Sequence, residues 1–453
     1  MRILEAIRAN RALRLAIVGA GGKTSTMFAL ARQIEAPVIV TASAHLALEQ
    51  AQMADQHVII NSPDEIDRAL NDGLQADVVL FTGPTDQRGR TRGLDGLSLE
   101  KLRQYADDMN SPLLLEADGA RCLALKAPAA HEPPIPGWVN HVIVVSGLSA
   151  LGKPLDETTV FRSEIFSSIS GNPIGTDITI NGIVDYLLAP NGGLKNIPIQ
   201  AQRTILLNQT DLTDIDKIDW EAPIQRLLSA YNRILLGVMS SPSGISGLVI
   251  RRFEKIAGIV LAAGESTRFG APKQLLMWRG KSFIRHVTER AIEAGLNPVL
   301  VIVGAVVEPI RQALDGLGVQ MIENPDWEKG LSGSVRSGLI NHSAEWGGAI
   351  FLMSDMPQVT QALIKDLIEI HQREFVQIVV PRVAGRRTNP VFFDQGCFSE
   401  LMKITGDTGG RVLFDRYPIH WLDWDDPNLL LDIDTIEDYQ ELNQLPLNTN
   451  HER

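Results

Sequence analysis

Near-continuous apolar runs alternate with helical stretches through the first half of the chain. The runs are LRLAIVG (13–19), PVIVTAS (37–43), DVVLFTG (77–83), SPLLLEADGA (111–120), HVIVVSGL (141–148) and TILLNQTD (204–211). Runs of this kind are typical of parallel strands covered by helices on both faces of the sheet. The pattern predicts an α/β fold, and sheets of this class bind ligands at the carboxyl ends of their strands.

The same alternation restarts near residue 256. Apolar runs at 259–263, 298–305 and 348–353 are separated by helical stretches such as 281–294. Before them, MSSPSGISGLVIRRFEK (239–255) is rich in serine and glycine, a composition typical of linkers. The chain has 453 residues, too many for one ordinary core. We therefore expect two domains, at 1–240 and 256–445, with a linker at 241–255 and a tail at 446–453.

Composition narrows the class of protein. Hydrophobic residues make up 44% and charged residues 21%, as in soluble globular proteins. The net charge of −12 argues against a general nucleic-acid or membrane surface, so any phosphate site must be locally basic. Two distant cysteines favour a reducing compartment, and no apolar run approaches the length of a membrane span. We expect a cytoplasmic protein without nucleic-acid or membrane partners.

A polar loop follows the strand predicted at 259–263. It carries Gly264, Arg268, Gly270 and Lys273 before a helix resumes. Glycines let a backbone approach a ligand closely, and exposed amides with two cations can neutralise a chain of phosphates. Most glycine-rich turns are only turns, so the loop alone is weak support for a phosphate site.

The loop resembles the signature of the MobA-like nucleotidyltransferases, L-A-A/G-G-x-S-x-R-x-G-x-x-K. The matching residues are Leu261, Ala262, Ala263, Gly264, Ser266, Arg268, Gly270 and Lys273. The resemblance implies a Rossmann-like, three-layer α/β/α domain over 256–445 that transfers a nucleotide. It also implies that Leu261 to Gly264 contact the nucleotide, while Arg268 and Lys273 hold its phosphates as catalytic residues.

Two further parts of this half resemble the same family. The segment 319–339 builds a polar loop before a helix, in positions that the family uses for the base and ribose: Asn324, Gly330, Ser332, Ser334 and Arg336. VAGRRTNPVFF (383–393) and TGDTGGRVLF (405–414) resemble elements around the second substrate, with Thr388 in place of Gly and Gly410 in place of Ala. They make Asn389, Asp407 and Arg411 candidates for substrate binding. Turn residues and surface charge are the alternative interpretation.

Two acidic segments suggest a metal site. GAIFLMSDMP (348–357) is an apolar strand that ends in Asp355, and LLLDIDTIEDYQEL (429–442) places Asp432 and Asp434 at another predicted strand end. A Mg²⁺ ion needs few carboxylates, because waters and phosphate oxygens fill its other positions. By resemblance to the family, we expect Asp355 and Asp434 to bind magnesium, with Asp432 as the substitute. Glu437 and Asp438 suit the first turn of a closing helix.

The N-terminal half has its own glycine loop. Gly21, Gly22, Lys23 and Thr24 follow a strand and begin a helix, in the order of a P-loop, where amides hold phosphates and Thr24 can reach a magnesium ion. The strict pattern is not met, because the first glycine is Gly19 rather than residue 17. A tight turn with a solvated lysine is the alternative interpretation, and ATP or GTP is the ligand expected otherwise.

Charged residues gather after the later strands of this half. Glu116 and Asp118 follow one predicted strand, with Arg121, Lys126 and His131 in the next loop. Either acid can orient a magnesium-bound water or a nucleophile, or simply cap the strand. Asn208 and Asp211 resemble the base-reading Asn-x-x-Asp of GTPase-like folds, although a plain strand ending is equally compatible.

Four motifs of the N-terminal half together resemble the YqeC family: GAGGKTS, EADGAR, LKAPAAHEP and ALGKPL. The family comprises accessory proteins of selenium-dependent molybdenum hydroxylases, and the resemblance spans about residues 10–240. Lys153, Arg162 and Glu164 belong to this stretch and either serve an anionic ligand or form a surface ion-pair cluster.

The two resemblances imply one pathway. The C-terminal half is most similar to the molybdenum cofactor cytidylyltransferases, in which Ala rather than Gly precedes the first signature glycine, as Ala263 does here. The implied reaction joins CMP from CTP to molybdopterin-bound molybdenum, with release of pyrophosphate, for a hydroxylase of the xanthine dehydrogenase type. The alternatives are GTP as donor, a sugar or polyol phosphate as acceptor, and a nucleotide-gated carrier or chaperone for the cofactor. Trp421 and Trp424 are candidates for stacking on a flat ring.

Overall fold

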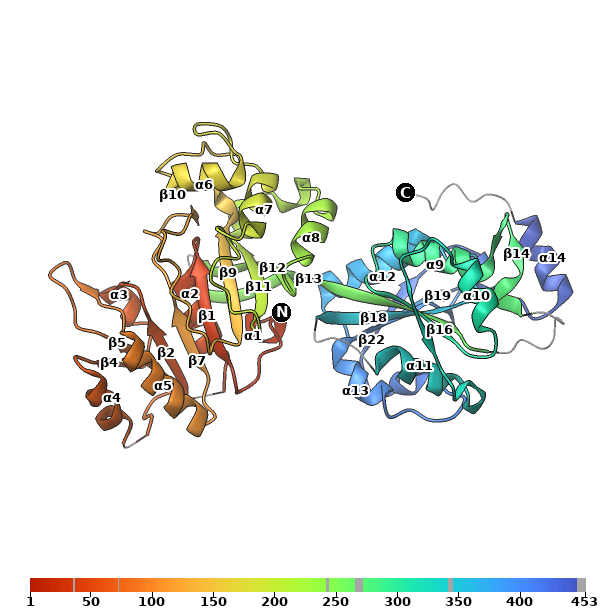
Figure 1. Ribbon diagram of the computed structural model, residues 1–453, viewed down its shortest axis with the longest axis horizontal. Helices are drawn as coiled ribbons and strands as arrows, with labels where there is room; N and C mark the ends of the chain where they lie inside the picture. Colours follow the sequence, from red (N-terminus) through yellow and green to blue (C-terminus); the bar gives the residue numbers. More distant parts are fainter. Residues whose placement is uncertain (36, 72, 242–243, 265–271, 341–344, 446–453) are drawn as a thin grey trace. The chain divides into compact units, whose positions relative to one another are not determined.

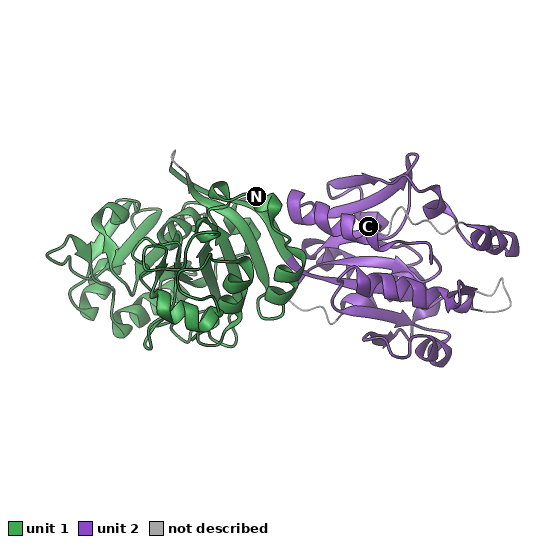
Figure 2. Ribbon diagram, turned by 90° about the horizontal axis from the view of Figure 1, so that it is seen from above, with its two compact units in different colours: residues 1–253 green, residues 254–453 purple. Residues whose placement is uncertain are grey.

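The computed structural model describes residues 1–35, 37–71, 73–241, 244–264, 272–340 and 345–445 (Figure 1). The chain divides into two compact units, Met1–Phe253 and Glu254–Arg453, called unit 1 and unit 2 below (Figure 2). Among the described residues, no helix is long and apolar enough to cross a membrane. The predicted tail at 446–453 lies outside the described residues.

Unit 1 is built on a parallel sheet. Its strand order is β12-β11-β9-β1-β7-β2-β5-β4, and every pairing along this order is parallel. The strands are β1 (Arg14–Gly19), β2 (Val38–Ala42), β4 (Gln56–Ile59), β5 (Val78–Thr82), β7 (Leu113–Glu116), β9 (His141–Gly147), β11 (Gln202–Asn208) and β12 (Arg233–Ser241). Short strands β3 (Leu46–Ala47), β6 (Arg90–Thr91), β8 (Leu125–Lys126) and β10 (Val160–Phe161) lie in the loops. The parallel sheet predicted from the six apolar runs is confirmed.

Helices cover this sheet. They are α1 (Ile3–Ala6), α2 (Lys23–Ala31), α3 (Leu48–Ala51), α4 (Pro63–Leu70), α5 (Gly96–Asp108), α6 (Ser163–Ser170), α7 (Ile180–Leu188) and α8 (Glu221–Leu228). Alternate strand residues such as Ala16 and Val18 form one core cluster with buried side chains of α4, α5, α7 and α8. Helix α2 packs against β1 and β7, and its buried Met27 and Phe28 lie outside that cluster. Successive side chains of a strand point to opposite faces, so both faces of the sheet are covered.

The segment expected to be a linker is instead strand. β13 (Gly244–Ala262) begins inside the predicted linker and contains the boundary between the two units. Its first part neighbours β12, and the amide of Val249 donates to the carbonyl of Met1. The segment is rich in serine and glycine, which suggested a linker. The backbone of Val249 nevertheless has a partner more than 200 residues away in sequence, and composition alone does not reveal such a partner.

Unit 2 has a mixed sheet of order β17-β16-β13-β18-β21-β19-β22, with β20 (Arg386–Arg387) paired to β19. Only β21 runs antiparallel to its neighbours in this order. The strands are β16 (Val299–Val303), β17 (Gln320–Glu323), β18 (Trp346–Met353), β19 (Ile378–Val383), β21 (Val391–Asp394) and β22 (Ile419–Asp423), with a hairpin of β14 (Met277–Trp278) and β15 (Lys281–Ser282). The chain runs from β13 outward to β17 and returns to β18 on the other side of β13. Ligands of open α/β sheets bind at such a switch point.

Two helical layers enclose the unit 2 sheet. The helices are α9 (Phe283–Glu293), α10 (Val307–Ala313), α11 (Leu331–Leu339), α12 (Gln361–Glu374), α13 (Phe398–Leu401) and α14 (Ile436–Gln444). Buried residues of α9, α10 and α12 share one core cluster with the sheet, while those of α11 and α13 share another. The predicted three-layer α/β/α architecture is confirmed.

The sequence analysis expected Asp432 and Asp434 at the end of a strand, but the described structure has no strand directly before them. Residues Pro427–Leu430 form a 3₁₀ turn, with the Asp426 side chain accepting from the amide of Asn428, and the chain is irregular until α14. Proline at the start of the turn has no amide to donate to a ladder, which favours the turn over a strand. Glu437 and Asp438 lie in the first turn of α14 as predicted, and Asp438 forms a capping box with Thr435.

Candidate functional site

The switch point of unit 2 brings together charged residues from three segments. Leu261 and Met353 are paired across β13 and β18, and Asp355 follows two residues after β18. Lys273 begins the 3₁₀ turn after the glycine loop and is buried, and its ammonium forms an ion pair with Asp434. The structure therefore brings together three residues that lie up to 161 positions apart in sequence.

Electrostatics tie Asp355 to the same group. Burial raises the pKa of Asp355, Lys273 opposes this rise, and the charges of Asp432 and Asp434 add to it. The negative charges of Asp432 and Asp434 thus disfavour the ionised form of Asp355, and the positive charge of Lys273 favours it. Asp432 is exposed and Asp434 is only half-buried, so both remain accessible from water. Binding of magnesium by Asp355 and Asp434 stays a prediction.

Burial and a side-chain hydrogen bond hold the end of β13 in place. Leu261, Ala262 and Ala263 are buried, and the side-chain amide of Gln274 donates to the carbonyl of Gly264 at 3.2 Å. Sequence analysis missed Gln274, which had no motif to mark it. Arg268, with Ser266 and Gly270, lies outside the described residues.

Helix α11 begins where its predicted polar loop ends. Ser332 and Ser334 are buried, and the side-chain amide of Asn324 donates to the Ser334 hydroxyl at 3.2 Å. The Arg336 guanidinium donates to the carbonyl of Ile404 at 2.5 Å, which ties α11 to the segment before Gly406. This contact gives Arg336 a structural role, and its role in nucleotide binding stays a prediction.

A cavity of about 420 Å³ opens beside these strand ends. Its wall is mostly apolar, and it includes Leu261 and Met353 together with Phe351, Phe393 and Phe414. The three residues predicted for substrate binding, Asn389, Asp407 and Arg411, all line it, and so do Thr388 and Gly410. Asp407 also accepts from the amide of Leu331 at 3.3 Å, at the start of α11. Trp421 and Trp424 are not among the lining residues.

Unit 1 has a larger and more polar cavity, of about 710 Å³, at the carboxyl ends of β1 and β7. Seven residues predicted for nucleotide binding or for the neighbouring acidic site line it: Gly21, Gly22, Lys23, Thr24, Glu116, Asp118 and Arg121, whereas Lys126 does not. His131 and Arg162 also line it, whereas Lys153 and Glu164 do not. The sequence analysis missed four lining residues because they come from distant segments: Gln50 of α3, Arg90 of β6, Phe161 of β10 and Gln209 after β11.

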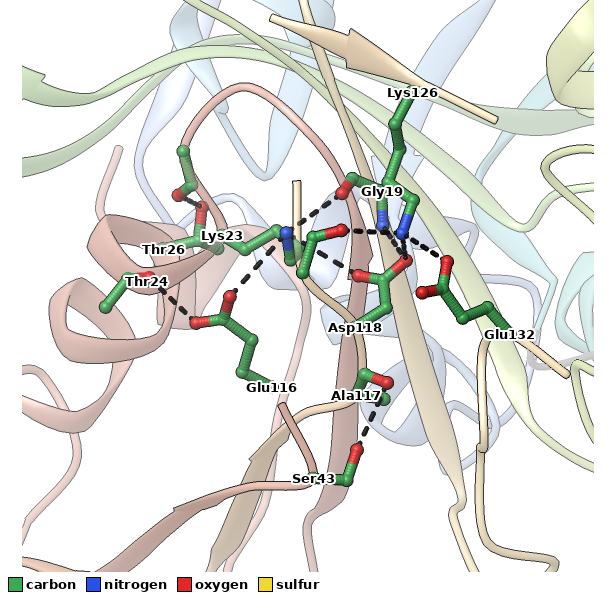
Figure 3. A network of polar contacts seen from close by, with 12 residues as sticks. Gly19, Lys23, Thr24, Thr26, Ser43, Glu116, Ala117, Asp118, Lys126 and Glu132 are labelled. Atoms are coloured by element: carbon green, nitrogen blue, oxygen red, sulfur yellow. Dashed lines mark hydrogen bonds and ion pairs between the residues drawn. The ribbon is translucent and has the colours of Figure 1, made fainter. Parts of the chain in front are cut away.

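An alternating chain of charges begins at the wall of this cavity, and Figure 3 shows its contacts from Lys23 and Glu116 to Glu132. The Lys23 ammonium lies 3.6 Å from Glu116 and 3.5 Å from Asp118, and it donates to the carbonyl of Gly19 at 3.0 Å. Asp118 continues to Lys126 at 2.7 Å, Lys126 to Glu132 at 3.0 Å, and Glu132 to Arg162 at 2.7 Å. We call these six residues the ion-pair chain. Most of its side chains are nearly excluded from water.

Two carboxyl groups of the ion-pair chain, Glu116 and Glu132, have pKa values shifted in opposite directions. Burial raises the pKa of Glu116, against Lys23 and the hydrogen bond at 2.8 Å from the Thr24 hydroxyl. Burial acts in the same direction on Glu132, but the hydrogen bonds and charges of Arg162 and Lys126 outweigh it and lower its pKa to about 2. Glu132 is therefore an anion at neutral pH that positions Arg162, while burial favours the protonated form of Glu116.

The glycine loop of unit 1 is occupied by the protein itself. The amide of Ala20 donates to the carbonyl of Val145 and that of Gly21 to the carbonyl of Leu123, at 2.9 and 3.0 Å. At Gly19, φ is +95° and a Cβ atom would lie 2.2 Å from the carbonyl oxygen of Val145. A P-loop cradles phosphates with free amides, so this loop departs from that geometry at two of its amides.

Asn208 also serves this loop. Its buried side chain donates to the carbonyl of Gly21 at 2.7 Å and accepts from the amide of Met239 at 3.0 Å. These bonds give the side chain a structural role, and the base-reading role considered from its sequence stays a prediction. Asp211 is exposed in the following turn.

Among the described residues, no group of three or more His, Cys, Asp and Glu side chains could hold a metal ion. A metal ion in either cavity would therefore need oxygen ligands from a bound substrate or water.

Two family models match the chain, and both resemblances seen in the sequence are confirmed. Residues 258–420 match the MobA-like NTP transferase domain, and residues 15–164 match the YqeC protein family.

Individual relatives match each half separately. YqeC of Escherichia coli (strain K12) is 29% identical over 199 residues, 43% of this chain and 75% of that protein. The purine catabolism protein PucB of Bacillus subtilis (strain 168) is 30% identical over 200 residues, 41% of this chain and 94% of that protein. A probable molybdenum cofactor guanylyltransferase of Bacillus cereus (strain ATCC 10987 / NRS 248) is 35% identical over 136 residues, 29% of this chain and 64% of that protein.

Proposed function

We propose, from the premise that this chain belongs to the MobA-like NTP transferase family and has a YqeC domain, that it transfers CMP from CTP to molybdopterin-bound molybdenum and releases pyrophosphate. The proposal rests on the family and on one observation. Lys273, Asp355 and Asp434 converge at the switch point of unit 2, beside a cavity of substrate size. A transfer reaction needs a charged centre and a second binding site side by side, and unit 2 has both.

In nucleotidyl transfer, a phosphate oxygen of the acceptor attacks the α-phosphorus of the nucleotide. The new O–P bond forms as the bond to the pyrophosphate leaving group breaks. The protein contributes placement and neutralisation of the spreading negative charge, with no covalent intermediate. Lys273 would bind the triphosphate once its pair with Asp434 is exchanged, and Arg268 would assist it. The buried strand end from Leu261 to Ala263 would carry the loop amides that contact the nucleotide.

The acidic group fits a magnesium ion. Asp355 lies in a partly buried position where Asp432 and Asp434 raise its pKa, and a divalent cation would remove this repulsion. Asp355 and Asp434 would hold the ion with carboxylate oxygens, and phosphates and waters would complete its shell. When bound, Mg²⁺ supplies charge neutralisation at the phosphates.

The cavity beside this centre would receive the acceptor. Its apolar wall suits the flat ring of a pterin, while Asn389, Asp407 and Arg411 supply polar contacts at the same wall. Arg411 carries the charge expected for a phosphate of the acceptor. The product would then pass to a molybdenum hydroxylase of the xanthine dehydrogenase type, and unit 1 would bind ATP or GTP in an accessory role.

CTP and GTP are the two candidate donors. Ala263 is buried at the end of β13, and a methyl group at this position narrows the room for a purine, which supports CTP. The similarity to a protein named as a guanylyltransferase supports GTP. An alanine and a glycine at this position of the protein differ by one methyl group, which is worth roughly 10- to 200-fold in selectivity.

A pyrophosphate-release assay tests the proposal. The full-length protein is supplied with Mg²⁺, molybdenum-loaded molybdopterin and either CTP or GTP, and we expect release with CTP. Ala263→Gly should shift the preference toward GTP by roughly tenfold. Sugar and polyol phosphates in place of molybdopterin serve as the control acceptors. Release with these acceptors but not with molybdopterin would refute the proposal, and release only with GTP would correct the donor.

A further inference from the structure

The cavity of unit 1 contains a second cationic region besides Lys23 of its glycine loop. Phe161 has two guanidinium groups over its ring, with the Arg162 carbon 4.2 Å and the Arg121 carbon 4.7 Å from the ring centre. All three residues line the cavity. We call them the arginine wall. Stacking on an aromatic ring fixes the plane of a guanidinium and leaves its N–H edge available to a planar or tetrahedral anion.

The charges of the cavity show which cation is left for a ligand. In the ion-pair chain, the cations Lys23, Lys126 and Arg162 match the carboxylates Glu116, Asp118 and Glu132, three against three. Arg90 is paired with Asp86 at 3.2 Å. Arg121 is exposed and belongs to no ion pair among the residues that the structure describes. It is therefore the uncompensated cation of this cavity.

The backbone is strained at the same place. Arg121, Cys122 and Arg162 have φ values of 51°, 61° and 61°, in the left-handed region that side chains with a Cβ atom rarely adopt. Strain of this kind persists where the surrounding structure holds it, and it gathers at binding sites. In unit 1, both arginines of the arginine wall have this strained backbone conformation.

The glycine loop is less well prepared for an anion than the arginine wall. The amides of Ala20 and Gly21 already donate to backbone carbonyls, and Lys23 is shared by two buried carboxylates. A phosphate at Lys23 would have to take this lysine from Glu116 and Asp118, which would then lie buried without a counter-charge. A phosphate at Arg121 displaces no partner within the described structure.

We propose that the cavity of unit 1 binds a small phosphorylated ligand with its phosphate on the arginine wall, not on the glycine loop. Arg121 would hold the phosphate through two N–H groups. Arg162 already donates to both carboxylate oxygens of Glu132 and to the carbonyl of Ala127, so it would contribute mainly its positive charge. The remaining volume, toward Gln50 and Gln209, would receive the rest of the ligand. The inference rests on the ligand-binding role proposed for unit 1 and places that ligand.

Cys122 provides a reporter confined to this cavity. It is exposed and lines the cavity beside Arg121, whereas the other cysteine, Cys397, is buried in unit 2. Alkylation by iodoacetamide, followed by mass spectrometry of the full-length protein, therefore measures occupancy of unit 1 even when unit 2 also binds the probe. The probes are inorganic phosphate, pyrophosphate and ADP, each with EDTA to remove divalent cations.

We expect pyrophosphate and ADP to protect Cys122. Arg121→Gln should raise the half-protecting concentration roughly tenfold or more, since a charge-assisted hydrogen bond is lost. Arg121→Lys should recover part of the protection, because the charge remains without the bidentate geometry. Arg68→Gln, which removes an exposed arginine of α4, is the matched control and should leave protection unchanged.

Two results would overturn the arginine wall. Protection that is lost in Lys23→Gln but retained in Arg121→Gln would assign the phosphate to the glycine loop and keep the proposed role of unit 1. Absence of protection by all three probes in the wild-type protein would overturn both. Neither result bears on pyrophosphate release by unit 2, so failure here is distinguishable from failure of the transferase assignment.

Discussion

Both units place a lysine behind a glycine loop at the carboxyl end of their first sheet strand, yet the two lysines are held differently. Lys23 lies between Glu116 and Asp118, whose side chains are only 7% and 2% exposed. Lys273 pairs with Asp434, whose side chain is 44% exposed. Water can replace a half-exposed partner at little cost, whereas a buried carboxylate needs its counter-charge. The same local pattern therefore builds a fixed network in unit 1 and an exchangeable pair in unit 2.

The largest expected effect concerns these lysines. Lys23→Met should destabilise unit 1 by about 3–5 kcal/mol, because it leaves two buried carboxylates beside each other. Lys273→Met should destabilise unit 2 by only about 1 kcal/mol, since water reaches Asp434. Hydrogen exchange of amides in β1 and in β13, followed by mass spectrometry, reports on each unit separately. Equal losses of local stability in the two variants would contradict the distinction between a fixed network in unit 1 and an exchangeable pair in unit 2.

The exchangeable site should be the one with transfer chemistry. Asp355→Asn should lower kcat for pyrophosphate release by about 100-fold or more, because a charge that binds the metal and the phosphates is removed. Glu437→Gln makes the same chemical change on an exposed residue in the first turn of α14 and should leave kcat within about twofold. An active Asp355→Asn variant would mean that this aspartate has no part in the transfer.

A smaller effect should separate two carboxylates that each bind two cations. Glu132 in unit 1 contacts Lys126, which is 1% exposed, while Glu289 in unit 2 contacts Lys281, which is 48% exposed. Burial raises the pKa of each carboxyl, but the cations outweigh it, so the pKa of Glu132 falls from 4.5 to about 2 and that of Glu289 falls as well. A lowered folded-state pKa contributes stability above the unfolded value, and this is lost as the pH falls toward the folded value.

Unfolding free energies measured between pH 7 and pH 2 test this difference. The wild-type protein should lose stability between about pH 4.5 and 2, and Glu132→Gln should remove up to about 2 kcal/mol of that loss, allowing for solvent screening. Glu289→Gln should remove less, because its lysine is half in water. If Glu289→Gln changes the acid dependence more than Glu132→Gln does, burial of the partner is not what matters.

The smallest expected effect compares two helix caps. Thr179 accepts from the amide of Gly182 at the start of α7, and Thr435 accepts from the amide of Asp438 at the start of α14. Replacement of either threonine by alanine should cost about 1 kcal/mol of local stability. Only Thr435→Ala should also raise KM for the nucleotide, because Asp434 precedes this cap. A similar rise in Thr179→Ala would show that the effect is not local to Asp434.

Apolar patterning was sufficient to predict the two sheets and the positions of several site residues. Long apolar runs identified the strands of both units, since burial on both faces leaves a direct trace in the sequence. Residues at or just after the end of a strand, such as Glu116, Asp118 and Asp355, were placed at the carboxyl edge of their sheet because parallel strands end at a common edge. The same reasoning failed for Asp434, which reaches the site from an irregular segment, and for the linker, where β13 forms through a distant partner.

The sequence alone determined the layered α/β architecture, the family of each half and the acids at the ends of the strands. The tertiary structure alone decided that the amides of Ala20 and Gly21 are already bonded, that Lys23 is held by two carboxylates and that Arg121 pairs with no carboxylate of the described residues. Local patterns record which residues avoid water and which can turn. Whether a charge is compensated depends on side chains that come from distant positions, and only the folded chain brings them within a few ångströms of one another.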